Sequence, residues 1–328
     1  MTTQAIVLRA HGDADRLAAE MIDVPHAGPG EIRIRQTAIG VNFHDVYVRN
    51  GSYRTLPLPG IPGIEAVGIV EEVGAGVSGH AVGDRVGYVT GTYGAYAAMR
   101  VLPADLAIPI PATFDDRQAA SLLLKGMTAQ MLLRQVRRVQ PGETILVHAA
   151  AGGVGRLLCQ WASRLGATVI GTVGSEQKAR IAQAAGCHHT VLYRETDFAP
   201  AVMDLTAGAG VDVAYDSVGK DTFDGSLAVL GPLGHLVNFG QASGPVPPFE
   251  VSRLAARSNS LTRPIIFHYL ADPARRNAMA ADLFAAFDAG ILSAPECETF
   301  PLSHAADAHR RMESRLAGGA VVLVPEGG

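Results

Sequence analysis

The stretch HAAAGGVGRLLCQWASRLGA, residues 148–167, decides the fold of this chain. It follows the apolar run ILV and opens a helical pattern whose apolar residues share one face: Val154, Leu157, Leu158, Trp161 and Leu165. A glycine-rich turn between a buried strand and a helix aims the free N–H groups of the first helical turn at a phosphate. The stretch therefore predicts a βαβ unit that binds a dinucleotide.

Each residue of this turn has a different structural role. Gly152 lets the backbone approach a pyrophosphate, Gly155 lets the helix pack closely on the strand, and Gly153 and Val154 open the helix beside the cofactor. Ala150 replaces the first glycine of the G-x-G-x-x-G pattern, so the motif reads AxGxxG. The alternative interpretation is a turn that packs a helix on a strand without any ligand.

The alternation of strand-like and helix-like patterns continues on the carboxyl side of this motif. Apolar runs alternate with amphipathic stretches and read TVIGTVG, HTVLYR, VDVAYDSVG and HLVNFG. Alternation of this kind predicts an α/β domain with a doubly wound parallel sheet. We expect a further helix over 273–288, with Gly290 as its C-cap.

The region before the motif has a different pattern. Short strand-like runs such as 32–41 and 66–74 are separated by Gly/Pro clusters such as 57–63, which predicts antiparallel strands in a compact, β-rich domain. The pattern becomes helical over 118–139. We expect the last strand, AVVLVP at 320–325, to return to the β-rich domain.

Composition narrows the classes of function. The chain has 328 residues, enough for two domains, and its net charge of −4 without a Lys/Arg run argues against nucleic acid or an anionic membrane as the main partner. Three widely spaced cysteines form neither a disulfide framework nor a CxxC pair. With no signal peptide and no long apolar segment, we expect a cytoplasmic protein that acts on a small molecule.

The end of the second strand discriminates between cofactors. A carboxylate at that point accepts hydrogen bonds from the adenosine ribose of NAD, whereas a 2′-phosphate requires its absence and a nearby cation. Here Gly174 and Ser175 occupy the turn, Lys178 follows one turn into the next helix, and Glu176 serves the helix dipole. We therefore expect NADPH, with a merely solvated Lys178 as the alternative.

Other candidate cofactor contacts lie where parallel strands end. Tyr193 follows the strand HTVL, Ser217 follows VDVAYD, and Phe239 with Gly240 follows HLVN. Tyr193 is suited to stack or hydrogen-bond near the adenosine; a half-buried strand tyrosine is the alternative.

The sequence resembles the quinone oxidoreductase (zeta-crystallin-like) branch of the zinc-independent medium-chain dehydrogenase/reductase superfamily. The segments that carry the resemblance span nearly the whole chain: GVNFHDVYVRNGSY (40–53), LPGIPGIEAVGIVEEVG (58–74), GDRVGY (83–88), GMTAQMLL (126–133), HAAAGGVG (148–155), YDSVG (215–219), FGQASG (239–244), LTRP (261–264) and ESR (313–315). The resemblance implies a GroES-like catalytic domain over 1–121, completed by 295–328, and a Rossmann NADPH-binding domain over 122–294. It also implies an active site between the two domains and a homodimer.

The resemblance implies a site without zinc. Zinc-dependent relatives have a cysteine where this chain has Asn42 and a histidine where it has Ile64, and neither residue here is a zinc ligand. The resemblance places Asn42, Tyr47 and Tyr53 at the catalytic site, with the Asn42 amide and the Tyr47 phenol as hydrogen-bond donors. Asp45 is expected to be structural, with general-base catalysis as the alternative.

Three further residues match family positions near the cofactor. Thr128 matches a position near the nicotinamide ribose, and Arg263 and Arg315 match positions near the cofactor, with structural ion pairs as the alternative. Hydride transfer to an acceptor needs alignment and stabilisation of the developing oxyanion, which hydrogen-bond donors supply. The expected reaction is therefore NADPH-dependent reduction of a small quinone. An alkenal or enone double-bond reductase and a non-catalytic, crystallin-like NADPH-binding protein are the alternatives.

Overall fold

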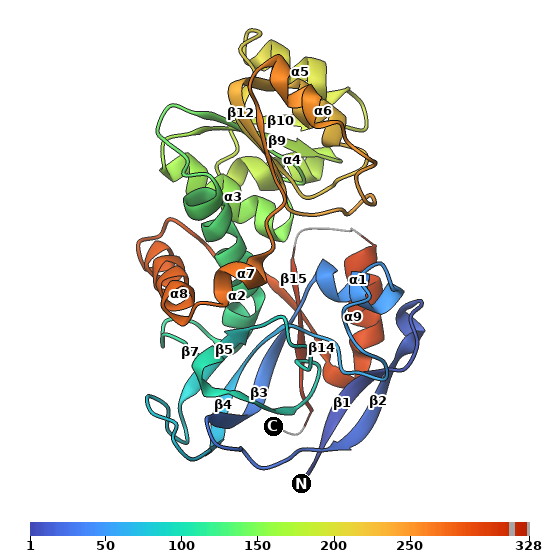
Figure 1. Ribbon diagram of the computed structural model, residues 1–328, viewed down its shortest axis with the longest axis vertical. Helices are drawn as coiled ribbons and strands as arrows, with labels where there is room; N and C mark the ends of the chain where they lie inside the picture. Colours follow the sequence, from blue (N-terminus) through green and yellow to red (C-terminus); the bar gives the residue numbers. More distant parts are fainter. Residues whose placement is uncertain (315–318, 327–328) are drawn as a thin grey trace. The chain divides into compact units, whose positions relative to one another are not determined.

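The computed structural model describes residues 1–314 and 319–326, which form two compact units (Figure 1). Unit 1 comprises Met1–Leu124, Leu270–Ala281 and the described residues from Ala294 onward; unit 2 comprises Lys125–Tyr269 and Asp282–Ser293. Among the described residues, no helix is both long and apolar enough to cross a membrane.

Unit 2 contains the doubly wound parallel sheet that the sequence predicts. Its elements are β8 (Thr144–Val147), α3 (Gly153–Arg164), β9 (Thr168–Val173), α4 (Glu176–Ala184), β10 (His189–Leu192), α5 (Phe198–Leu205), β11 (Val211–Asp216), α6 (Phe223–Ala228), β12 (Leu230–Asn238), the 3-10 helix η4 (Val251–Ala256) and β13 (Ser260–Thr262). The strands pair in the order β10-β9-β8-β11-β12-β13, and every pair is parallel. This order reverses direction at β8, so the carboxyl ends of β8 and β11 flank the crevice in which such sheets bind ligands.

Unit 1 is the β-rich domain. Its elements are β1 (Thr2–Leu8), η1 (Ala14–Arg16), β2 (Leu17–Asp23), β3 (Glu31–Val41), α1 (Phe43–Asn50), β4 (Glu65–Val73), β5 (Arg85–Val89), β6 (Met99–Pro103), η2 (Ala104–Leu106), β7 (Ile108–Pro109), β14 (Cys297–Pro301), η5 (Leu302–His304), α9 (Ala305–Glu313) and β15 (Ala320–Val324). Its larger sheet runs β14-β15-β3-β4-β5-β7, with β6 also on β3. The C-terminal strand β15 lies antiparallel beside β3, as expected for a strand that returns to this domain (Figure 1).

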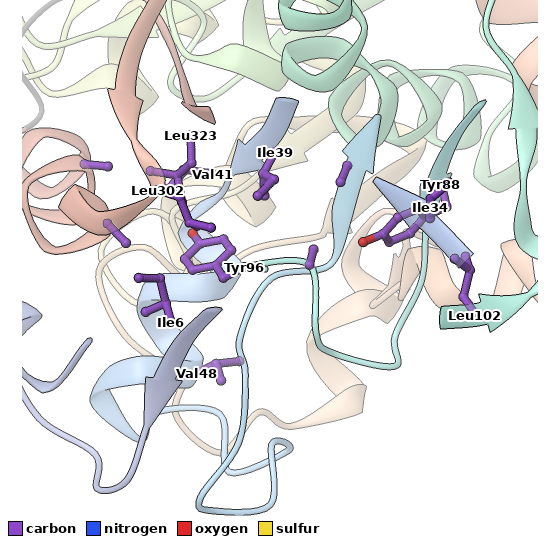
Figure 2. Packing of buried hydrophobic residues seen from close by; sticks show 14 of the residues in the cluster. Ile6, Ile34, Ile39, Val41, Val48, Tyr88, Tyr96, Leu102, Leu302 and Leu323 are labelled. Carbon is purple, nitrogen blue, oxygen red and sulfur yellow. The ribbon is translucent and has the colours of Figure 1, made fainter. Parts of the chain in front are cut away.

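Apolar side chains from distant parts of the sequence fill the core of unit 1. One cluster contains four fully buried residues from different segments: Ile6 of β1, Ile39 of β3, Leu323 of β15, and Tyr96 from the loop before β6 (Figure 2). A separate cluster in unit 2 includes Leu146 of β8 and Leu236 of β12. Each unit therefore has a hydrophobic core of its own.

The chain passes from one unit to the other within three helices: α2 (Asp116–Gln130), α7 (Ile266–Leu270) and α8 (Pro273–Asp288). The expected helix over 273–288 is confirmed, and Gly290 follows it with φ +65°. The helical stretch expected over 118–139 ends earlier. After α2, a π-helix (η3, Met131–Val136) continues it until Arg137 adopts extended backbone with φ −144°.

Candidate active site

In unit 1, the candidate acceptor site is built on the start of α1. Asn42 is the N-cap of this helix, and its backbone N–H donates to Oδ2 of Asp45 (2.8 Å). The Asp45 carboxylate is fully buried and also accepts a hydrogen bond from the Tyr96 hydroxyl (3.3 Å). Asp45 thus caps and anchors the helix that carries Tyr47, which accords with a structural role.

The side chain of Asn42 is fixed by a second carboxylate. Its Nδ2 donates to Oε1 of Glu65 across 2.7 Å, while Oε2 of Glu65 accepts the backbone N–H of Leu124 (2.7 Å). Glu65 is fully buried at the start of β4, and a Cβ at Gly40 would lie only 2.2 Å from its Oε1. One amide hydrogen of Asn42 is therefore engaged by Glu65, and the second remains for another acceptor.

Aromatic rings gather on and around α1, the helix that Asn42 caps. The Tyr47 and Tyr53 rings meet edge to face with centroids 5.1 Å apart, His44 contacts both Tyr53 and Tyr93, and Phe43 lies 6.2 Å from Tyr47. We call Phe43, His44, Tyr47, Tyr53 and Tyr93 the aromatic cluster. Tyr47 and Tyr53 are both half-buried, so each ring is fixed by packing and yet remains accessible.

The aromatic cluster carries no formal charge. Burial lowers the pKa of His44 to about 4, so its imidazole is neutral near pH 7, and its Nε2 lies 3.0 Å from the Tyr93 hydroxyl. Burial also raises the pKa of Tyr93. An open hollow of about 540 Å³ is lined by Tyr93 of the cluster and by Thr55, whose hydroxyl is hydrogen-bonded to the Tyr93 hydroxyl. Such a surface suits a neutral, planar, partly apolar molecule.

In unit 2, the glycine-rich turn precedes α3. Gly152 is the N-cap and is exposed, and a Cβ at Gly155 would lie 2.3 Å from the carbonyl oxygen of Ala149. Gly155 therefore permits the close packing that the sequence predicts. Ala149 itself has φ +52°, a left-handed conformation that residues other than glycine rarely adopt.

A lysine on α2 also lies against this turn. The side chain of Lys125 on α2 lies against Gly153, whose Cβ would be 2.8 Å from the lysine Cδ. Thr128 follows Lys125 by three residues on the same helix, so the two share a face. Val154 is half-buried in the first turn of α3. No sequence pattern points to Lys125, because its position depends on how α2 packs on the turn.

A second group forms where β9 and β10 end. Ser175 is the N-cap of α4, and its hydroxyl oxygen accepts the backbone N–H of Lys178 (3.4 Å). A Cβ at Gly174 would lie 2.8 Å from the Tyr193 hydroxyl, so these four predicted residues are brought together. Glu176 is the first residue of α4, as expected, where its charge favours the helix dipole.

A third group forms where β11 and β12 end. A Cβ at Gly240 would lie 2.5 Å from the carbonyl oxygen of Ser217, and the N–H of Phe239 donates to the carbonyl of Asp216 (2.8 Å). Arg263 Nη1 donates to the Gly240 carbonyl (3.1 Å) and to both oxygens of Asn238 (3.0 and 3.1 Å). Arg263 thus holds this loop in place through hydrogen bonds. Arg315 lies outside the described residues.

The buried carboxylate of Asp216 organises the same loops. Its Oδ1 accepts the N–H groups of Val218 (2.8 Å) and Gly219 (3.0 Å) and the hydroxyl of Thr222 (2.8 Å). Its Oδ2 accepts Nδ2 of Asn238 (3.2 Å). A carboxylate with several hydrogen bonds rigidifies the strand ends that lie nearest the predicted ligand.

Known proteins match the chain over its length. Residues 28–112 match the alcohol dehydrogenase GroES-like domain, and residues 153–283 match a family model described as zinc-binding dehydrogenase. The 2-haloacrylate reductase of a Burkholderia species is 45% identical over 98% of this chain and 99% of its own, and the quinone oxidoreductase of Pseudomonas aeruginosa is 43% identical with the same two coverages. The chain belongs to the quinone oxidoreductase branch of the medium-chain dehydrogenase/reductase superfamily.

The solved structure of one relative in this branch contains a bound cofactor. The quinone oxidoreductase of Escherichia coli, whose structure was determined in complex with NADPH, is 39% identical and superposes with a TM-score of 0.95 over 98% of this chain and 100% of that chain. The predicted fold, a GroES-like domain with a Rossmann domain, is confirmed by these matches and by the two sheets.

Proposed function

We propose that this chain is an NADPH-dependent oxidoreductase that reduces a small quinone or a related conjugated carbonyl compound without zinc, as a cytoplasmic homodimer. The observation that carries the proposal is the uncharged aromatic cluster on and around α1, the helix that Asn42 caps. Two accessible phenols, Tyr47 and Tyr53, and the remaining Asn42 amide hydrogen are donors for a carbonyl oxygen, and the rings are a flat apolar surface for the acceptor.

The residues of unit 2 fit NADPH. The first turn of α3, which begins after the exposed Gly152, presents backbone N–H groups to a pyrophosphate, and the end of β9 has Gly174 in place of the ribose-binding carboxylate. Ser175 accepts the N–H of Lys178, which leaves its hydroxyl hydrogen to donate to a phosphate. We propose that Val154, Thr128, Tyr193, Ser217, Phe239, Arg263 and Arg315 complete the cofactor contacts.

When bound, NADPH supplies a hydride from its nicotinamide to the acceptor. The chain then has to stabilise the negative charge that develops on the acceptor oxygen. We assign this to the Tyr47 phenol and the Asn42 amide, because preorganised donors in a low-dielectric site stabilise developing charge without reorganisation. Glu65 holds the Asn42 amide in place, and Asp45 holds the start of α1.

A second candidate function is the reduction of a carbon–carbon double bond conjugated to a carbonyl or carboxyl group. The 45% identity to a 2-haloacrylate reductase favours it. A carboxylate substrate requires a cation. The members of the aromatic cluster are uncharged, with the pKa of His44 lowered to about 4 by burial, but Nη2 of Arg100 donates to the Tyr93 carbonyl oxygen (2.8 Å) and places a cation next to the cluster. Assays with both classes of substrate therefore decide between the two candidate functions.

Steady-state assays separate these candidates. NADPH and NADH are each tested with simple quinones, enones and 2-chloroacrylate, and Lys178→Ala is tested in parallel. We expect NADPH to be preferred with quinones, and Lys178→Ala to weaken NADPH by about tenfold while NADH changes little, since one charge-assisted contact is lost. Equal specificity constants for the two cofactors in the unaltered chain would contradict the NADPH assignment. If none of the acceptors is reduced, the result would favour a protein that binds NADPH without catalysis.

A further inference from the structure

Arg194 follows Tyr193 at the end of β10, next to the turn that the Proposed function assigns to the adenosine end of NADPH. Its Nε lies 3.4 Å from the position that a Cβ at Gly174 would occupy. Strands β9 and β10 are parallel neighbours, with Leu192 opposite Val173, so the residues that follow them are brought side by side. An arginine that extended freely into solvent would not lie over the adjacent strand end.

The guanidinium of Arg194 has no hydrogen-bond or ion-pair partner within residues 1–314 and 319–326, although Glu195 is its neighbour in the sequence. It shares the turn with a second cation, Lys178, whose backbone N–H is bonded to the Ser175 hydroxyl oxygen. The N-terminus of α4 adds a partial positive charge at the same place. Two cations and a helix N-terminus at one turn favour a doubly charged anion.

Gly174 keeps this turn open. A Cβ at this position would lie 2.8 Å from the Tyr193 hydroxyl, which would have to move, and 3.4 Å from Nε of Arg194, which is an ordinary van der Waals contact. Glycine therefore removes the ribose-binding carboxylate and leaves room for the Tyr193 phenol beside Arg194.

We propose that Arg194 is a specificity-determining residue whose guanidinium binds the 2′-phosphate of the cofactor together with Ser175 and Lys178. The inference rests on the proposed function, since it requires NADPH as the cofactor. Guanidinium binds phosphate through two parallel N–H donors, which a lysine cannot reproduce, so Arg194 and Lys178 contribute differently.

The test is calorimetric binding of two probes to the purified full-length chain: adenosine 2′,5′-bisphosphate, which carries the 2′-phosphate, and adenosine 5′-monophosphate, which lacks it. We expect Arg194→Ala to weaken the bisphosphate about tenfold and to leave the monophosphate within about twofold. Arg194→Lys should restore only part of the affinity. Arg180→Ala removes another exposed arginine, on the opposite side of α4 from Lys178, and serves as the matched control that should leave both probes unchanged.

The outcomes separate the inference from the function on which it rests. If the unaltered chain prefers the bisphosphate and Arg194→Ala keeps that preference, the inference is wrong and the NADPH assignment stands. If Arg194→Ala weakens both probes equally, the arginine contacts the adenine and the inference is also wrong. If the unaltered chain binds both probes equally, the NADPH assignment itself is wrong. Thermal unfolding of each variant checks that the changes are local.

Discussion

The side-chain amide of Asn42 donates a 2.7 Å hydrogen bond to the buried carboxylate of Glu65, and the other carboxylate oxygen accepts the N–H of Leu124. One buried carboxylate thus joins β4, the start of α1 and the helix α2. Since Glu65 accepts from two donors, a neutral amide in its place satisfies only one of them.

We expect Glu65→Gln to destabilise the chain by about 2 kcal/mol, because one buried donor loses its partner. The acceptor KM should rise as well, since Asn42 is no longer held. Chemical denaturation and steady-state kinetics measure the two effects. Glu71→Gln, which removes a partly exposed ion pair with Arg35, is the control and should cost less than about 1 kcal/mol. Equal costs for the two variants would show that the Asn42–Glu65 contact has no special importance.

Tyr47→Phe tests the proposed oxyanion donor. We expect kcat for a quinone to fall about tenfold to a hundredfold, with NADPH affinity nearly unchanged, because the contact forms only as charge develops. Asp45→Asn should act mainly through stability, since Asp45 caps α1 and accepts from Tyr96. If Tyr47→Phe and Asn42→Ala both retain full kcat, these residues only shape the site.

The absence of zinc is a separate prediction. Asn42 and the buried Ile64 stand where zinc-dependent relatives have ligands, so exhaustive chelation should leave the rate unchanged. Elemental analysis before and after chelation is the measurement. Stoichiometric zinc whose removal abolishes activity would overturn this part of the proposal.

Two buried histidines predict acid sensitivity of the fold. Burial lowers the pKa of His309 to about 3 and that of His148 to about 4, whereas an unfolded histidine titrates near 6.5. Between these values the unfolded chain binds protons that the native chain does not. The free energy of unfolding should therefore fall as the pH drops below about 6.5, by about 1 kcal/mol per pH unit for each histidine, until the folded pKa is reached.

Denaturation at several pH values measures this slope. His309→Gln keeps a polar partner for the Tyr96 hydroxyl but cannot titrate, so the slope should decrease by about one proton. His268→Gln, at an exposed position, is the control. An unchanged slope in His309→Gln would mean that His309 is protonated in the native chain over this range.

The sequence predicted those parts of the structure that depend on local patterns. The alternation after Thr144, the turn at Gly152 and Gly155, and the C-cap at Gly290 all follow from residue type and spacing, and the structure has them. The left-handed Ala149 could not be predicted, because alanine has no preference for that conformation and the surrounding fold imposes it.

Contacts between distant segments were also beyond prediction. The Asn42–Glu65 bond joins residues 23 apart, and the approach of Arg194 to Gly174 depends on the pairing of β9 with β10. His44 and Tyr93 join the aromatic cluster only through tertiary packing. The candidate residues Tyr47 and Tyr53 were identified by resemblance, and their roles remain predictions.

The most direct test of the central claim is a single-turnover reaction of the purified, chelator-treated chain with p-benzoquinone and NADPH deuterated at the transferred position of nicotinamide C4. The proposal predicts that NADPH disappears and hydroquinone forms in equal amounts, more slowly with the deuterated cofactor than with the unlabelled one, because breaking the C–H bond delivers the hydride. No consumption of NADPH with p-benzoquinone or with any enone would contradict the claim that this chain is a reductase.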